Sequence, residues 1–273
     1  MKKIIYDIGA NNGDDVEYYL MKSDLVIAVE ANPSLCTRIR ERFKTAIETG
    51  ILVVENYIIA IQPTAKNMAF YIHKKHHVLS QFPEPNEESI TNFSRLYIPA
   101  ITPMELLNRH GNPYYIKIDI EHYDAKILRC LFENNIFPDY ISAESQSAEI
   151  LCLLVALGGY NSFKTVTGST VSKKYRKVPI VKLNGQTQIY SFPQHSAGPF
   201  AEDIHGNWLS GNGLIRKLGA HGLGWIDIHA TRKSVEVSDF TTTQALAILS
   251  KKFFELVVTR VKIRSRLKRA LNK

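Results

Sequence analysis

The chain has 273 residues, of which 45% are hydrophobic and 22% are charged. This composition excludes a wholly disordered chain, a collagen-like chain and a disulfide-rich miniprotein. No run approaches the roughly 20 apolar residues that span a bilayer, and Asp7 interrupts the first apolar run too early for a signal peptide. We therefore expect a cytoplasmic protein. The three cysteines, Cys36, Cys130 and Cys152, form no CxxC pair, so we expect reduced core residues and no metal site.

The net charge of +8 comes from one segment. Residues 251–273 contain nine lysine and arginine residues and a single acidic residue, Glu255. The first 250 residues are therefore neutral overall. Binding to nucleic acid requires a basic surface on the folded body, so we expect no nucleic-acid partner.

Short apolar runs alternate with amphipathic segments through the first 160 residues. Strands that alternate with helices predict an α/β fold, with a doubly wound and mainly parallel sheet that helices cover on both faces. The predicted strands are 3–8, 25–29, 51–54, 114–120 and 140–143. The predicted helices are 14–21, 33–43, 103–109, 124–132 and 147–157.

Two segments interrupt this alternation. Residues 57–60 and 68–72 flank a polar turn, which predicts an inserted hairpin. Residues 73–98 contain three histidines and two prolines with little periodicity. They predict a long loop, and long loops in compact domains often form lids or binding segments.

The pattern weakens beyond residue 160. Segments 161–166 and 187–192 are predicted to be antiparallel strands that close the sheet, and the glycine-rich segment 196–225 is predicted to be a structured loop. We expect residues 1–230 to form one domain and residues 231–273 to form a linker and a helical basic tail.

The turn after the first strand has the composition of a nucleotide-binding loop. The segment Asp7–Gly13 reads Asp-Ile-Gly-Ala-Asn-Asn-Gly and leads directly into a helix. Small residues allow the backbone to approach a ligand and direct the helix N-terminal amides at it. The neighbouring strand ends in Glu30, whose carboxylate can accept hydrogen bonds from both hydroxyls of a ribose. Together the two features predict an adenosine-containing cofactor.

The charge of this turn discriminates between two cofactors. Asp7, Asp14, Asp15 and Glu30 would repel a pyrophosphate and attract the sulfonium and ammonium groups of S-adenosylmethionine. The Gly-x-Asn-x-Gly spacing also differs from the GxGxxG pattern of dinucleotide sites. The sequence favours S-adenosylmethionine, and a NAD-dependent oxidoreductase on the same fold is the alternative.

Three motifs in order along residues 3–165 resemble those of FkbM-type S-adenosylmethionine-dependent methyltransferases. They are the turn 7–13, Val-Glu-Ala-Asn-Pro at 29–33 and Tyr-Ile-Lys-Ile-Asp-Ile-Glu at 115–121. The resemblance implies a class I, Rossmann-like methyltransferase fold and O-methylation, commonly of a sugar or another hydroxyl of a natural product or glycan. The chain departs from the family in one place, because His122 follows where the third motif usually continues with glycine.

These motifs define the candidate site residues. Asp119 ends the fourth predicted strand beside the turn, so we expect it to contact the cofactor or to orient the acceptor. Glu121 or His122 is expected to be the general base, although Glu121 as a helix cap and His122 as a surface residue are the alternatives. A second polar cluster, His195, Glu202, Asp203 and His205, could close over the acceptor. The expected cofactor-binding residues are Asp7, Gly9, Asn11, Gly13, Glu30, Asn32, Asn56 and Asp119.

The C-terminal segment predicts a short amphipathic helix followed by a cationic run. Five apolar residues lie on one helical face: Leu246, Leu249, Phe253, Leu256 and Val257. This combination is typical of segments that bind the surface of an anionic membrane. A helix packed on the body, with a disordered basic end, is the alternative.

The sequence therefore predicts an S-adenosylmethionine-dependent O-methyltransferase, cytoplasmic or peripheral on a membrane. Its expected acceptor is a sugar hydroxyl of a glycan or glycolipid precursor. A non-catalytic, membrane-associated module that binds the cofactor is the alternative from another functional class.

Overall fold

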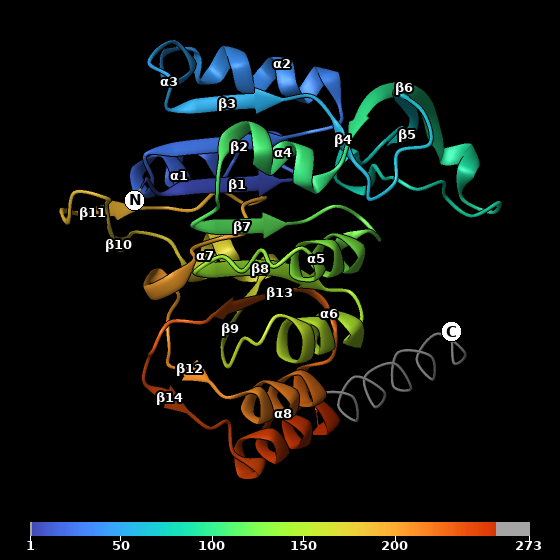
Figure 1. The fold of residues 1–273 in the computed structure, drawn as a ribbon. Coiled ribbons are helices and arrows are strands. Elements are labelled where there is room, and N and C mark those ends of the chain that lie inside the picture. Colours follow the sequence, from blue (N-terminus) through green and yellow to red (C-terminus); the bar gives the residue numbers. More distant parts are fainter. Residues whose placement is uncertain (1, 255–273) are drawn as a thin grey trace, which may run out of the picture.

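The computed structural model describes residues 2–254 and contains one large sheet (Figure 1). Its strands are β1 (Ile4–Ile8), β2 (Leu25–Val29), β3 (Leu52–Glu55), β7 (Tyr115–Ile118), β8 (Tyr140–Ser145), β9 (Ser162–Thr167), β12 (Trp208–Leu209), β13 (Gly224–Thr231) and β14 (Val237–Ser238). They are ordered β14-β12-β9-β13-β8-β7-β1-β2-β3. The run from β8 to β3 is parallel, and β13 lies antiparallel between β8 and β9. The predicted doubly wound, mainly parallel sheet with antiparallel closing strands is confirmed.

Helices cover both faces of this sheet. They are α1 (Val16–Lys22), α2 (Pro33–Arg42), α3 (Lys44–Glu48), α4 (Pro103–His110), α5 (Asp124–Glu133), α6 (Ala148–Cys152), α7 (Val171–Lys174) and α8 (Gly211–His221). Apolar residues of α4, α5, α6 and α8 share one buried core with one face of the sheet. Residues of α1, α2 and α7 share a second core with the opposite face. The strands between the two cores are buried on both sides, which explains their nearly continuous apolar sequences.

The predicted hairpin at 57–60 and 68–72 is wrong. Strand β4 (Ile58–Ile59) and strand β5 (Asn67–His73) both pair with β6 (Phe93–Ile101), in parallel and antiparallel orientation respectively. Residues 93–98 of strand β6 lie within the segment predicted as a loop. Four of its nine residues are exposed, so the strand is stabilised mainly by its hydrogen-bond ladder with β5 and shows no alternating apolar pattern.

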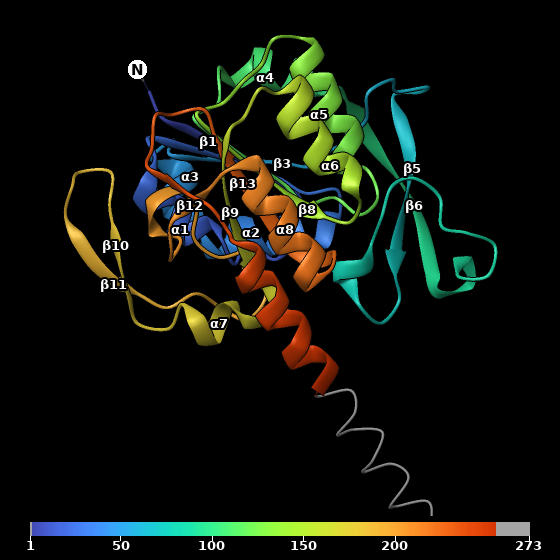
Figure 2. The same ribbon diagram turned by 90° about the horizontal axis from the view of Figure 1, so that it is seen from below.

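Two predictions beyond residue 160 are also wrong. The segment at 187–192 does not close the main sheet, because β11 (Thr187–Tyr190) pairs with β10 (Val178–Val181) in a separate hairpin. That hairpin and the β4-β5-β6 unit project from opposite sides of the molecule (Figure 2). The main sheet continues from β8 through β13 to β9, which lies at the predicted antiparallel strand 161–166. The predicted loop 196–225 contains β12 and α8.

Helix α8 forms in a glycine-rich sequence because tertiary packing overrides its weak helix propensity. Leu214 and Leu218 are buried in the core. Gly213 permits a close approach, since a Cβ atom there would lie 2.9 Å from the backbone nitrogen of Phe240. The main sheet also extends past the expected domain boundary at residue 230, because β14 pairs with β12.

The chain after β14 continues into a helix at residues 242–254. Lys252 Nζ donates to the carbonyl oxygens of Ala220 and His221 at the end of α8, at 3.0 and 2.6 Å. Three residues of the predicted apolar face, Leu246, Leu249 and Phe253, are exposed. Leu256, Val257 and the basic run lie outside the described residues.

The cysteines form no disulfide bond among the described residues. All three cysteines are free, and Cys36 and Cys130 are buried as expected, whereas Cys152 is exposed. Among residues 2–254, no helix has the length and apolar character required to cross a bilayer.

Candidate cofactor and acceptor site

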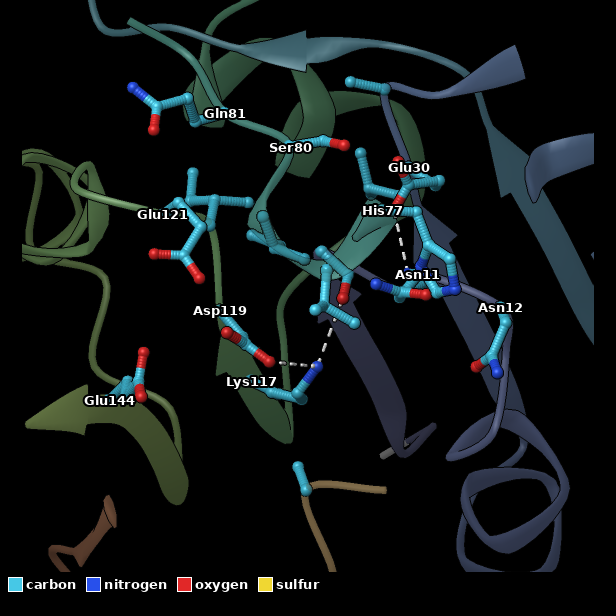
Figure 3. Close-up of a pocket in the computed structure, with 18 of the residues that line it drawn as sticks. Asn11, Asn12, Glu30, His77, Ser80, Gln81, Lys117, Asp119, Glu121 and Glu144 are labelled. Atoms are coloured by element: carbon cyan, nitrogen blue, oxygen red, sulfur yellow. Dashed lines mark hydrogen bonds and ion pairs between the residues drawn. The ribbon is translucent and has the colours of Figure 1, made fainter. Parts of the chain in front are cut away.

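The carboxyl ends of β1, β2, β7 and β8 border a cavity of about 540 Å³. This volume lies within the range of roughly 300–1,000 Å³ that is typical of ligand sites. The turn after β1, the ends of the neighbouring strands and residues 77–82 of the β5–β6 connection line the cavity, together with residues 195–197 and the start of β13. Figure 3 shows Glu30 and Asn11 on one side and Glu121 and Glu144 on the other, with Asp119 and Lys117 between them.

The turn after β1 is held tightly between its neighbouring strands. The backbone nitrogens of Gly9 and Ala10 both donate to the carbonyl oxygen of Val29, at 3.0 and 2.9 Å. Gly9 has a φ of 88°, and a Cβ atom there would lie 1.9 Å from the carbonyl oxygen of Asp119. Glycine at this position therefore allows β7 to approach the turn, whereas Gly13 packs against α2 and does not line the cavity.

Glu30 is the main polar group on the cofactor side. Its two carboxylate oxygens accept hydrogen bonds from the backbone nitrogens of Asn11 and Asn32, at 2.8 and 2.7 Å. Each oxygen keeps further capacity to accept a hydrogen bond, so the carboxylate can still receive two ribose hydroxyls. Burial raises the pKa of Glu30 to about 7. The buried Oδ1 atom of Asn11 has no partner within the described residues, which leaves a second acceptor for a ligand.

We expect cofactor affinity to increase as the pH rises through about 7. Ribose hydroxyls donate to the ionised carboxylate, so binding favours the deprotonated form of Glu30, whose pKa is about 7 in the folded protein. Calorimetric titration of S-adenosylhomocysteine from pH 6 to pH 8 measures the effect. Glu30→Gln should bind more weakly and lose most of this pH dependence. A dependence that persists in Glu30→Gln would assign it to another group.

Asp7 is engaged with a buried lysine. Asp7 and Lys117 are paired in the parallel register of β1 and β7, and Lys117 Nζ lies 3.1 Å from Asp7 and 3.2 Å from Asp119. Burial disfavours the ammonium, but attraction by Asp7 and Asp119 outweighs it and raises the pKa of Lys117. Asp7 is fully buried and does not line the cavity, so its role here is to hold Lys117.

The other acids of the turn also have protein partners. Asp14 forms an ion pair with Arg42 at 3.2 Å. Asp15 accepts hydrogen bonds from the Ser196 hydroxyl and from the backbone nitrogen of Ala197, the latter at 3.0 Å. Asp15 therefore fixes residues 196–197 against the turn. Lys117 and Arg42 therefore neutralise part of the negative charge of the acidic residues in the turn after β1.

Two further predicted cofactor residues support the loop that carries Glu30. The side chain of Asn32 accepts from the backbone nitrogen of Ser34 at 3.0 Å and caps α2. Asn56 Nδ2 donates to the carbonyl oxygens of Glu30 and Ala31, both at 2.9 Å. Neither Asn32 nor Asn56 lines the cavity. Of the predicted cofactor residues, those that line it are Gly9, Asn11, Glu30 and Asp119.

Glu121 faces the cavity on its far side. Burial, Glu144 and Asp119 raise the pKa of Glu121 to about 7. Gln146 Nε2 donates to both glutamates, at 3.3 Å to Glu121 and 2.8 Å to Glu144. Glu121 does not cap the next helix, because the N-cap position of α5 is Tyr123 and no side chain caps it. The structure thus adds Glu144, at the end of β8, to the predicted acceptor side.

His122 lies outside the cavity, although it was a candidate for the general base. It is exposed and does not line the cavity, and its backbone nitrogen donates to Gln146 Oε1 at 3.2 Å. Its φ of 63° lies in the left-handed region, which glycine adopts without steric cost. Glycine, which the resemblance places at the corresponding position of the family motif, would adopt this conformation without strain.

The predicted cluster at 195–205 is not gathered at the cavity. His195 lines it, whereas the ring of His205 lies 4.7 Å from the ring of Tyr175, centroid to centroid, in a tilted arrangement. Glu202 accepts from Trp208 Nε1 at 3.3 Å, and Asp203 forms an ion pair with Lys22 at 2.8 Å. These contacts attach the segment to the body.

Comparison with known proteins identifies the family of the chain. The family model described as the methyltransferase FkbM domain matches residues 7–148, slightly more than half of the chain. No curated protein matches. A solved structure of methyltransferase FkbM from Methylobacillus flagellatus KT has a TM-score of 0.39 and 13% identity, covering 60% of this chain and 39% of that one. The chain thus spans about two fifths of that structure.

Two other solved structures are similar at a comparable level. Precorrin 8w decarboxylase from Methanobacterium thermoautotrophicum has a TM-score of 0.39 and 10% identity, with coverage of 85% of this chain and 82% of that one. Phosphoethanolamine N-methyltransferase 1 from Haemonchus contortus, in complex with S-adenosylhomocysteine, has a TM-score of 0.30 and 13% identity, covering 96% and 46%. With the family match over the turn, Glu30 and Asp119, the chain belongs to the FkbM methyltransferase family and uses S-adenosylmethionine.

Proposed function

We propose that the protein is an O-methyltransferase whose acceptor is a sugar hydroxyl of a glycan or glycolipid precursor. The observation that carries the proposal is the row of carboxylates, Asp119, Glu121 and Glu144, that lines the cavity opposite Glu30. Carboxylates accept hydrogen bonds from hydroxyl groups and can take up a proton. Trp225 also lines the cavity and is 52% exposed, which offers a flat apolar surface to a sugar ring.

Different residues would bind the cofactor and accept the proton of the acceptor. S-adenosylmethionine, when bound, supplies an electrophilic methyl group. Glu30 and Asn11 would hold its ribose, and Lys117 keeps Asp119 in place at the centre of the cavity. The protein must then orient the acceptor hydroxyl and receive its proton. Glu121 suits the second task, because its pKa of about 7 lies near neutral pH.

Methyl transfer to saccharides tests the proposal directly. The protein would be incubated with methyl-labelled S-adenosylmethionine and a panel of neutral and amine-bearing sugars and oligosaccharides. Mass spectrometry would then locate the added methyl. We expect an O-methyl ether and stoichiometric S-adenosylhomocysteine. Methylation on nitrogen or carbon would contradict O-methylation, and cofactor binding without turnover on any acceptor would favour a non-catalytic module.

Thermal unfolding separates the methyl-donor site from a dinucleotide site. We expect S-adenosylhomocysteine to raise Tm and NAD to leave it unchanged. A ligand that binds only the folded state stabilises it by roughly 2.7 kcal/mol at a hundredfold excess over Kd. Differential scanning fluorimetry with both ligands at equal concentration measures the difference. A shift with NAD and none with S-adenosylhomocysteine would reverse the assignment.

We also propose that the C-terminal segment binds the surface of anionic membranes. Four apolar side chains on the helix at 242–254 are exposed: Leu246, Leu249, Phe253 and Phe254. The sequence from 255 to 273 adds seven basic residues and one acidic residue. Exposed apolar side chains next to a cationic run suit an anionic lipid surface, to which each basic residue contributes about 1 kcal/mol. A lipid-linked acceptor would be found at such a surface.

Deleting residues 255–273 should abolish liposome binding and leave cofactor affinity unaltered. The deletion keeps Lys252 and its contacts with α8. Binding of the intact protein to phosphatidylserine liposomes should weaken with salt, because the Debye length falls to about 8 Å at physiological ionic strength. Co-sedimentation at low and high salt measures both effects. No sedimentation of the intact protein at low salt, or unfolding of the truncated one, would contradict the proposal.

A further inference from the structure

Asp227 and Glu144 place two carboxylates opposite each other in the sheet. They are direct partners in the antiparallel pairing of β13 with β8, so their side chains lie on the same face. Like charges in this arrangement destabilise a sheet. Both residues line the cavity. Asp227 is 4% exposed, and burial, Asp119 and Glu144 raise its pKa well above the usual range.

The carboxylate of Asp227 has no partner among residues 2–254. No hydrogen bond or ion pair joins it to those residues, and the attraction of Lys117 only partly offsets the effect of burial on its pKa. Lys117 is already shared between Asp7 and Asp119. A buried carboxylate without a partner is costly, and here its position in the cavity wall gives a ligand access to it. A ligand that carries a cationic group would supply the missing partner of Asp227.

The charge of this half of the cavity indicates what kind of partner that is. Four carboxylates line it: Asp119, Glu121, Glu144 and Asp227. Among the described residues that line the cavity, Lys117 is the only lysine or arginine. Its ammonium group already contacts Asp7 and Asp119. One amide, that of Gln146, serves Glu121 and Glu144 together. Burial and mutual repulsion hold protons on these acids in the free protein. A cation that enters this half favours their ionised forms, whereas a phosphate or carboxylate group does not.

Trp225 adds an aromatic surface to the same place. It precedes Asp227 by two residues on β13, lines the cavity and is half exposed. The face of an indole ring attracts an ammonium group within about 6 Å, and it also suits the apolar face of a sugar ring. Glu144, Asp227 and Trp225 therefore combine the features that a positively charged sugar requires.

We propose that the acceptor is an amino sugar, whose protonated amine lies in a subsite formed by Asp227, Glu144 and Trp225 while a neighbouring hydroxyl is methylated. This inference rests on the proposed function and specifies its substrate class. The same carboxylates exclude acceptors that carry a phosphate or a uronic acid near the reacting hydroxyl.

Calorimetry on the full-length protein saturated with S-adenosylhomocysteine tests the proposal. The probes are glucosamine, galactosamine and the β1,4-linked glucosamine dimer, each compared with its N-acetylated counterpart at pH 7. We expect each free amine that binds to do so at least tenfold more tightly than its neutral counterpart. Binding should release protons, because the ammonium favours the ionised carboxylates. The enthalpies should therefore differ between buffers of different ionisation enthalpy.

Variants locate the subsite. Asp227→Asn and Glu144→Gln should reduce the preference for the amine to less than threefold, with S-adenosylhomocysteine affinity unchanged. Glu149→Gln removes the same charge at a half-exposed position on α6 and should leave the preference intact. Thermal unfolding of each variant verifies its fold. If Asp227→Asn does not fold, Glu144→Gln and the buffer dependence of the wild-type protein decide the question.

The outcomes separate this proposal from the proposed function. Equal affinity for amines and N-acetyl sugars, or no binding of any amine, overturns the amino-sugar proposal. Methylation of neutral sugars in preference to amines also overturns it and leaves the O-methyltransferase assignment intact. Methylation of the amine nitrogen itself overturns both.

Discussion

Replacing Lys117 by methionine is expected to lower the free energy of unfolding by about 3–5 kcal/mol, the usual cost of removing one partner of a buried ion pair. Asp7 is fully buried and would lose the ammonium that lies 3.1 Å away. The Asp7 carboxyl would then remain protonated in the folded state, whereas it ionises in the unfolded chain near pH 3.9. The folded variant would bind the extra proton, so its stability should fall as the pH rises above about 4. Urea unfolding at pH 5 and pH 8 measures both effects.

Two controls isolate the buried pair in that experiment. Asp7→Asn combined with Lys117→Met removes both charges and should recover most of the lost stability. Lys44→Met removes a lysine whose side chain is 77% exposed, and it should change stability by no more than about 0.5 kcal/mol. A loss below about 1 kcal/mol at pH 8 in Lys117→Met alone would show that the pair contributes little.

Replacing Glu30 by alanine should weaken S-adenosylhomocysteine binding at least tenfold. Hydrogen bonds to a charged group contribute about 1.5–3 kcal/mol each, and two ribose hydroxyls would lose their acceptor. The fold should persist with a lower Tm, since the backbone nitrogens of Asn11 and Asn32 lose theirs as well. Calorimetric titration and thermal unfolding measure the two losses separately.

The matched control for this variant lies on the following helix. Glu41 is an exposed residue of α2, and Glu41→Ala should leave both affinity and Tm unchanged. Glu30→Gln retains a side-chain acceptor for one backbone nitrogen and should fall between the alanine variant and the wild type. If Glu30→Ala lowers Tm but binds the cofactor normally, Glu30 is structural and the ribose lies elsewhere.

The cofactor half of the site could be predicted because it follows from chain order. In a parallel sheet, the carboxyl ends of neighbouring strands meet at one edge, so Gly9, Glu30 and Asp119 come together once their strands are recognised. Their neighbours were harder to assign. Asn32 and Asn56 are polar residues at strand ends, as are the residues that line the cavity. Only their hydrogen bonds with the backbone show that they stabilise the loop after β2.

On the acceptor side, Asp119 and Glu121 could be predicted, but Glu144 and Asp227 could not, because their position depends on strand pairing. Asp227 meets Glu144 only because β13 pairs antiparallel with β8. The glycines of segment 196–225 predict a loop, so the sequence gives no local indication of a strand at 224–231. Strand β6 was missed for a related reason: it is stabilised by its ladder with β5, which leaves no apolar periodicity in the sequence. Pairing partners distant in sequence leave no local signal.

The two sides of the cavity come from separate parts of the chain, because β13 enters the sheet antiparallel to β8. The family match ends at residue 148, after the turn, Glu30, Asp119, Glu121 and Glu144, whereas Trp225 and Asp227 enter from the first residues of a strand that runs the opposite way. Two residues late in the chain thus line the proposed acceptor side and take no part in the contacts proposed for the ribose. Under the proposed function, substitutions at Trp225 and Asp227 would alter the acceptor contacts and leave Glu30 and Asn11, on the other side of the cavity (Figure 3), in place for the methyl donor.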